Sequence, residues 1–154
     1  MTILNALKAD HDEAKSMLKT ILATKDGKKR GQLFAEFKSK LTAHSRAEEK
    51  AFYRPLEKTE EGKTEALEGA VEHNVVDRLL ADLAAARQPE AETWTARCSV
   101  LQELLEHHID EEEGDFFKTA RKLFDRAALE KMGKDFAAEK SKIEVTVHSA
   151  AAAE

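Results

Sequence analysis

Cysteine, proline and glycine are scarce in this sequence, with one Cys, two Pro and six Gly among 154 residues. The single cysteine, Cys98, cannot form a disulfide within the chain, which favours a reducing cytoplasm. Trp94 and Leu101 neighbour it at helical spacing, so we expect a thiol in the core. With few helix breakers, 42% hydrophobic and 36% charged residues, the composition predicts an all-α protein of long amphipathic helices.

The sequence also lacks a long apolar run and a basic stripe. No stretch approaches the ~18 apolar residues of a membrane span. Charged residues between Lys8 and Lys15 interrupt the apolar core that a signal peptide would need. The formal net charge is −5, with acids and bases interspersed, so we expect neither nucleic acid nor a membrane as partner. The length suits one domain with a hydrophobic core.

Apolar residues at steps of three and four predict four long helices joined by short connectors. These helices run from about Thr2 to Thr24, from a charged turn at 26–31 to about 54–58, from Thr64 to about Arg87, and from Pro89 to about Phe124. Short connectors favour antiparallel neighbours, so the predicted fold is an antiparallel up-down-up-down four-helix bundle over residues 1–124. Residues 125–154 are predicted to add a short C-terminal helix, from Ala127 to about Lys140, and a flexible tail from Val145.

Two copies of one motif, H-x-x-x-E-E-x-x-F-aromatic, carry the chemistry of the chain. The first copy begins at His44 and the second at His108. On a helix, His44 and Glu48, or His108 and Glu112, lie on one face with Cβ atoms ~5–6 Å apart. The phenylalanine of each copy continues that face two turns later, so each polar pair lies within an apolar stripe. A buried imidazole and carboxylate need a partner, and a metal ion would serve both.

Four of the six histidines fall on the apolar stripes of four different helices. They are His11, His44, His73 and His108. His107 and His148 do not lie on the apolar stripe of a helix. In an antiparallel bundle, inward residues at matched depth converge, so the four histidines and the glutamates 48 and 112 form one candidate metal site. Six donors exceed a tetrahedral zinc centre and fit two ions, and imidazole with carboxylate suits iron, zinc, nickel or copper.

Each His–Glu pair, taken alone, has a simpler explanation than a metal site. For His44 and Glu48 alone, an intrahelical hydrogen bond is as good an explanation as a metal ion. The repeat favours metal, because the alternative needs four independently satisfied buried histidines. In the fourth helix, His107 and Glu111 share the same spacing, and alignment of the two copies by their phenylalanines selects the pair that begins at His108.

From about Leu4 to Phe124 the chain resembles the hemerythrin-like, HHE cation-binding proteins. The resemblance is carried by Asp10-His11, His44-x-x-x-Glu48-Glu49, Glu72-His73 and His108-x-x-x-Glu112-Glu113 with Phe116. It implies a non-haem centre of two iron ions, joined by an oxo or hydroxo bridge. By this resemblance the four histidines would be terminal ligands, and Glu48 and Glu112 would bridge the two ions.

One position departs from the pattern of oxygen-carrying hemerythrins, which have a second histidine one turn after the first on the third helix. This chain has Asp77 there, which either acts as a further metal donor or points away with Val76 turned inward. Both arrangements argue against simple oxygen carriage. We therefore expect a protein that binds dioxygen or senses oxygen, iron or nitric oxide, with a di-iron peroxidase or oxidase, or metal storage, as alternatives. Other acids, including Glu49 and Glu113, are interpreted as solvated.

Overall fold

The protein is built from helices alone over the residues described by this computed structural model, which are 1–153 for the backbone and 1–144 for the side chains. The helices are α1 (Ile3–Ala23), α2 (Gly27–Glu48), α3 (Arg54–Glu57), α4 (Lys63–Ala85), α5 (Glu92–Glu111), α6 (Phe117–Leu123) and α7 (Arg126–Ala153). Two π-helical turns, η1 (Glu49–Tyr53) and η2 (Glu112–Phe116), join α2 to α3 and α5 to α6. The predicted all-α class is confirmed.

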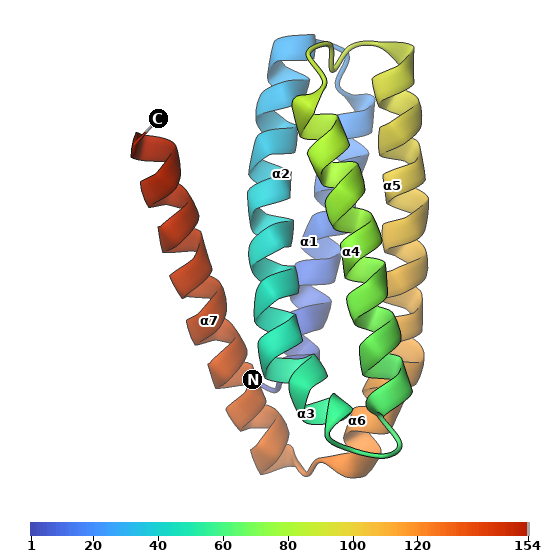
Figure 1. Cartoon of the computed structure of the whole chain (residues 1–154), viewed down its shortest axis with the longest axis vertical. Helices are drawn as coiled ribbons and strands as arrows, with labels where there is room; N and C mark the ends of the chain where they lie inside the picture. Colours follow the sequence, from blue (N-terminus) through green and yellow to red (C-terminus); the bar gives the residue numbers. More distant parts are fainter. Residues whose placement is uncertain (154) are drawn as a thin grey trace.

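The four long helices α1, α2, α4 and α5 stand side by side as an antiparallel bundle (Figure 1). Helix α1 packs against α2 and α5, and α4 packs against the same two helices from the other side. Short connectors turn the chain back at each end, so that the direction alternates along the sequence (Figure 1). The predicted up-down-up-down bundle is therefore confirmed.

Capping side chains determine where the first two helices begin. The Oγ1 of Thr2 accepts a hydrogen bond from the backbone N–H of Asn5 at 3.3 Å, as its predicted role as N-cap requires. The Oδ2 of Asp26 accepts in the same way from the N–H of Lys29 at 2.9 Å. Helix α2 therefore starts at Gly27, and the prediction of a turn over 26–31 is wrong for most of that segment.

Arg30 from that segment is buried at the end of the bundle, with 4% of its surface exposed. Its guanidinium donates to the carbonyl oxygens of Ile21, Leu22 and Pro89 and to Thr95 Oγ1, and it lies 5.1 Å from the ring centroid of Trp94. These bonds satisfy the carbonyl of Leu22 at the end of α1 and give that of Ile21, which also accepts from the N–H of Thr24, a second donor. They also hold Pro89 in the connector, so α5 begins at Glu92 and not at Pro89 as predicted.

Helix α7 lies against α1 and α2 (Figure 1). Its predicted apolar side is buried: Leu129, Met132 and Phe136 belong to the core. The helix continues to Ala153, beyond the predicted end near Lys140. The predicted tail from Val145 and the side chain of His148 lie outside the described side chains, and the domain division at residue 124 stays a prediction.

The core consists of two apolar clusters along the bundle axis. One contains Leu7, Phe52 and Phe117, and the other contains Leu41 and Cys98 among its members. Cys98 is fully buried, which confirms the predicted core thiol, and burial raises the pKa of this thiol to about 11.

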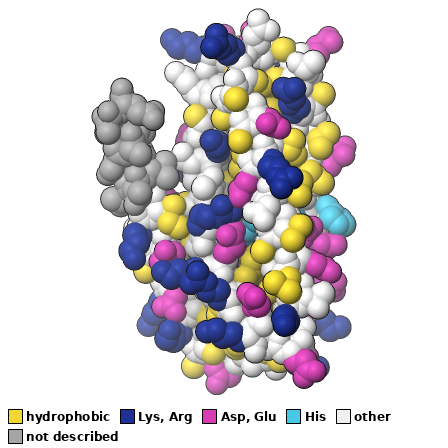
Figure 2. Space-filling view, viewed as in Figure 1, with side chains coloured by type: hydrophobic (Ala, Val, Ile, Leu, Met, Phe, Trp, Pro, Cys, Tyr) yellow, Lys and Arg dark blue, Asp and Glu magenta, His cyan; other side chains and the backbone are white. Residues whose placement is uncertain are grey.

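The surface carries charges of both signs. Figure 2 shows Lys and Arg side chains interspersed with Asp and Glu over one face, with apolar side chains between them. Within the described residues, none of the helices combines the length and the apolar character needed to cross a membrane.

Candidate metal centre

A layer of buried polar side chains separates the two apolar clusters. The six predicted donors His11, His44, Glu48, His73, His108 and Glu112 all lie in it. Glu48 and Glu112 are fully buried, and each imidazole belongs to a residue no more than 6% exposed. The bundle therefore brings together all six residues that the sequence placed on the apolar stripes of four helices.

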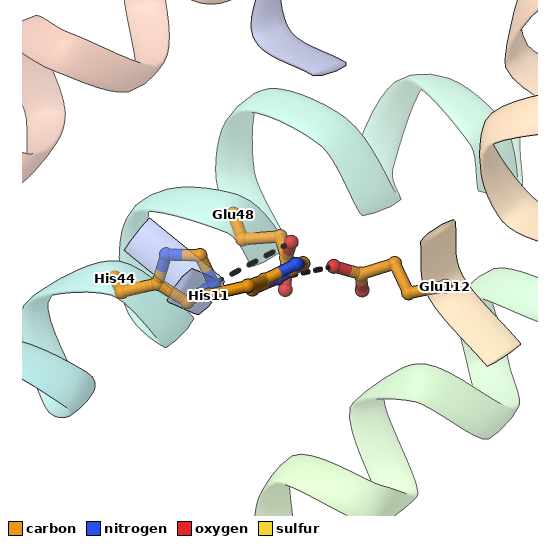
Figure 3. A group of neighbouring side chains, drawn as sticks. All are labelled: His11, His44, Glu48 and Glu112. Carbon is orange, nitrogen blue, oxygen red and sulfur yellow. Dashed lines mark ion pairs between the residues drawn. The ribbon is translucent and has the colours of Figure 1, made fainter. Parts of the chain in front are cut away.

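The donors form two groups that share one carboxylate. The first group consists of His11, His44, Glu48 and Glu112, whose side chains converge in Figure 3. The second group consists of Glu48, His73 and His108. Within each group one candidate ligand atom from every residue lies within 4.8 Å of the others. This is the arrangement that two neighbouring cations require.

Each glutamate directs one oxygen to each group. The Oε1 of Glu112 lies 3.0 Å from Nε2 of His11, and its Oε2 lies 3.4 Å from Nε2 of His108. The Oε1 of Glu48 lies 3.1 Å from Nε2 of His73, and its Oε2 lies 3.7 Å from Nε2 of the histidine four residues earlier. Both carboxylates therefore span the space between the two groups.

Several of these buried atoms have no hydrogen-bond partner among the described residues. They are Nε2 of His11, both oxygens of Glu48 and Oε1 of Glu112. Nε2 of His11 and Oε1 of Glu112 are 3.0 Å apart, yet their orientation does not make a hydrogen bond. An unsatisfied buried polar atom costs ~1–3 kcal/mol. Cations between the groups would satisfy all of these atoms, so the donor set fits a pair of metal ions.

A second set of carboxylates holds the four imidazoles in place. The Nδ1 atoms lie within hydrogen-bond distance of Glu113 (His11, 2.7 Å), Asp10 (His44, 2.9 Å), Glu49 (His73, 2.7 Å) and Glu72 (His108, 3.0 Å). An Nδ1–H that donates to a carboxylate leaves Nε2 free to bind a metal, and it orients the ring. Every imidazole therefore presents Nε2 to the layer.

The interpretation of Glu49 and Glu113 as solvated acids is wrong. Each binds a histidine on a helix other than its own, with side-chain exposures of only 33% and 22%. The sequence does contain a signal for these acids, because each of them stands directly next to a donor residue. Helical periodicity does not reveal their role, since it describes one face of one helix and not contacts between helices.

Charges within the layer balance one another. Burial opposes protonation of the imidazoles, but the neighbouring carboxylates raise the pKa of His73 to about 9 and that of His108 to about 10. Burial, together with the charge of Glu112, raises the pKa of Glu48. In the metal-free protein, protons on imidazoles therefore compensate the buried carboxylates. Metal ions would replace those protons.

The structure does not bring Asp77 into the layer. Its Oδ2 accepts a hydrogen bond from Nη2 of Arg46 at 2.9 Å, and its side chain is 31% exposed. Val76 is turned inward instead, with 5% of its surface exposed. The physical reason is the cation of Arg46, which pairs with Asp77 and with Glu49 at the edge of the bundle. Of the two arrangements open from the sequence, the structure has the one with Val76 inward.

The register of the fourth helix agrees with the alignment of the two motif copies. His108 is 4% exposed, whereas the side chain of His107 is 67% exposed and pairs with Glu111 at 3.0 Å. The surface pair has the same spacing as the buried pair but faces solvent.

Tyr53 is a residue of the layer that the sequence interpretation missed. It is 3% exposed, and its hydroxyl donates a hydrogen bond to Oε2 of Glu112. The hydroxyl oxygen of Tyr53 also lies 3.4 Å from Nε2 of His73 and 3.3 Å from Nε2 of His108. Burial and the nearby carboxylates raise the pKa of this phenol well above its ordinary value.

The π-helical turn explains why periodicity missed Tyr53. In an uninterrupted α-helix, nine residues place Tyr53 about 180° from His44. In η1 the N–H of Arg54 bonds to the carbonyl of Glu49, five residues earlier, so the turn holds one extra residue. This extra residue turns Tyr53 back towards the layer. The recognisable signal was the pair of adjacent aromatics at the end of each motif copy.

A cavity of about 110 Å³ lies against the layer. Its walls include the four imidazole-bearing histidines and the apolar side chains of Phe37, Leu41, Val76 and Leu105. Lys140 of α7 and Asp10 also line it, and they form an ion pair at 2.9 Å. The cavity exceeds the ~30 Å³ that a water molecule occupies in the liquid, so a small molecule can lie beside the Nε2 atoms.

Fold and site thus define a four-helix bundle whose buried His and Glu groups suit cations. The family described as "Hemerythrin HHE cation binding domain" matches residues 2–120, and the chain belongs to this family. A protein of Nostoc sp. (strain PCC 7120 / SAG 25.82 / UTEX 2576) named "DNA nickase" is 27% identical over 144 residues. The match covers 94% of this chain and 40% of that relative, so the chain spans two fifths of the relative's length. No solved structure matches the chain.

Proposed function

We propose that the protein holds two iron ions in the buried layer and uses them to bind dioxygen or to sense oxygen, iron or nitric oxide. The observation that carries this proposal is the pair of donor groups joined by carboxylates that face both. In this assignment His11 and His44 serve one ion, His73 and His108 serve the other, and the two glutamates bridge. Iron bound there would supply redox chemistry and open coordination positions for small oxygen- or nitrogen-containing ligands.

The chain's own residues support that chemistry in three ways. The carboxylates on Nδ1 hold each imidazole with Nε2 towards the ions, which increases its basicity as a ligand. The apolar side chains among the walls of the cavity lower the polarity beside the layer. The shared carboxylates hold the two ions at a short separation.

A di-iron peroxidase or oxidase is the second candidate. Val76 favours it, since an apolar side chain beside His73 leaves the cavity side of the layer without a further protein donor. The nickase activity named for the Nostoc relative is not proposed for this chain, because most of that relative lies outside the match.

Metal content after anaerobic loading with ferrous iron tests the proposal. We expect about two irons per chain, since six donors divided between two ions leave room for a bridge and a small ligand. His108→Ala should abolish the paired site, and His107→Ala, one residue away but at the surface, is the matched control. One zinc per chain and no iron after loading would refute the proposal.

Rapid mixing of the reduced protein with oxygen separates the two candidate functions. We expect quick oxidation in air and reaction with hydrogen peroxide, because Val76 leaves the layer open towards the cavity. Asp77→His, which supplies an imidazole one turn after His73, should slow that oxidation. A visible spectrum that is stable, reverses on degassing and is unchanged by Asp77→His would instead favour reversible oxygen carriage.

A further inference from the structure

The two halves of the layer are related by the repeated motif, but they are not equivalent. In the first group, ligand atoms of four His or Glu residues lie within 4.8 Å of one another; in the second group those of only three do, and the Oε2 of Glu112 beside it accepts the hydrogen bond of Tyr53. Alignment of the motif copies pairs Tyr53 with Phe117. The ring of Phe117 stacks 6.4 Å from that of His11 beside the first group, and the ring of Tyr53 lies 5.1 Å from that of His73 beside the second. A hydroxyl therefore stands only beside the group that has fewer donors.

The oxygen of Tyr53 occupies the position of a donor atom. It lies 3.4 Å and 3.3 Å from the Nε2 atoms of His73 and His108, and it bonds to Oε2 of Glu112. Two ligand atoms that are each about 2.1 Å from one ion lie about 3.0–3.4 Å apart at octahedral or tetrahedral angles. The two contacts of the Tyr53 oxygen with imidazoles therefore have the spacing of ligands around a common ion.

Helix α4 is shaped to admit this side chain. A Cβ atom at Gly69 would lie 2.7 Å from both the hydroxyl oxygen and Cζ of Tyr53, so any larger residue would have to displace the phenol. Glycine inside a helix costs ~0.5–1 kcal/mol relative to alanine, so it needs a packing reason. Gly69 stands four residues before His73, whereas Leu7 stands four residues before His11. The glycine is therefore in the half that contains Tyr53.

We propose that the phenolate oxygen of Tyr53 is a direct protein ligand of the metal ion held by Glu48, His73 and His108. The proposal rests on the two-metal centre proposed above. When the ion binds, the phenol O–H bond breaks, the proton passes to solvent, and a metal–oxygen bond forms. No electron is transferred in this step.

The test uses the fact that Tyr53 is the only tyrosine in the sequence. Ferric iron bound by a tyrosinate shows a charge-transfer band in the visible spectrum and tyrosinate ring modes in resonance Raman, and here the ring modes can come only from Tyr53. We expect both signals in the iron-loaded wild type. We expect Tyr53→Phe to lose them while it retains its helicity by circular dichroism and most of its iron.

A pair of glycine variants supplies a matched control. Gly69→Ala should weaken or shift the band, because its methyl group displaces the phenol. Gly114→Ala, in the π-turn η2, meets no atom within 4 Å and should leave the band unchanged. If Tyr53→Phe fails to fold, the wild type can be labelled with ring-deuterated tyrosine. The tyrosinate Raman modes must then shift to lower frequency if they come from Tyr53.

The outcomes separate this proposal from the one on which it rests. Wild-type protein that holds about two irons but shows neither the band nor tyrosinate modes overturns ligation by Tyr53 and leaves the metal centre intact. Protein that takes up no iron overturns the metal centre and this inference with it. A resonance Raman spectrum of Tyr53→Phe identical to that of the wild type also overturns the inference.

Discussion

Replacement of Glu113 by glutamine tests whether the acids behind the imidazoles tune metal binding. Its Oε2 lies 2.7 Å from Nδ1 of His11, and its side chain is 22% exposed. Glutamine keeps the length and shape of the side chain but removes the negative charge. The amide oxygen is a weaker acceptor for the Nδ1–H, so His11 becomes a less basic and less firmly oriented ligand.

The expected loss can be stated from the type of contact. Removal of a partner that orients a metal-bound histidine typically costs 10–100-fold in metal affinity, which corresponds to about 1.4–2.7 kcal/mol. Glu49→Gln should give a loss of the same order, because Glu49 holds His73 at the same distance of 2.7 Å. Its additional bond to Arg46, at 2.8 Å, makes it the less clean variant of the two.

Titration of the metal-free protein with a divalent ion, in competition with a coloured chelator, measures this affinity. Glu60→Gln is the control, since Glu60 is an exposed acid that the sequence alone did not distinguish from Glu113. The melting temperature of the metal-free variants shows whether folding is unaffected. If Glu113→Gln binds metal as tightly as Glu60→Gln does, the carboxylate does not act through His11 and the reasoning fails.

Three further predictions concern stability. Arg30→Met should lower the free energy of unfolding by about 3 kcal/mol in urea titrations, because it removes the donors of the Leu22 and Pro89 carbonyls; an effect below experimental error would contradict this. In the metal-free protein, raised imidazole pKa values make a contribution to stability that is complete below the ordinary value of 6.5. The melting temperature should therefore fall as pH rises through about 9 (His73) and about 10 (His108), and a constant value would refute this. Chelation of iron should lower the melting temperature, because it removes about 2.7 kcal/mol of binding stabilisation if free iron had been 100 times Kd; an unchanged melting temperature would argue against a site in the core.

The helices and the six central donors could be predicted from the sequence, because both depend on local order. Apolar residues repeat at helical steps, and the same motif begins at His44 and at His108. A helix converts such spacing directly into a shared face. Short connectors then leave little choice but an antiparallel bundle, in which matched depths converge.

The surroundings of the donors depended on contacts between helices, which spacing along one helix does not contain. Glu49 and Glu113 resemble surface acids until the bundle places a histidine of another helix against each of them. The sequence predicts Arg30 in a charged turn, whereas in the structure its guanidinium donates to three carbonyl oxygens from other segments.

Asp77 and Tyr53 show the two ways in which helical periodicity fails. Asp77 has the spacing of a donor, but a cation at Arg46 pairs with it at the edge of the bundle. Tyr53 lacks that spacing, and the extra residue of η1 rotates it into the layer, where Gly69 makes room for its ring. Sequence order determined which faces are apolar and where the donors stand. Tertiary packing decided which charges are paired, where a helix widens, and which side chains reach the centre.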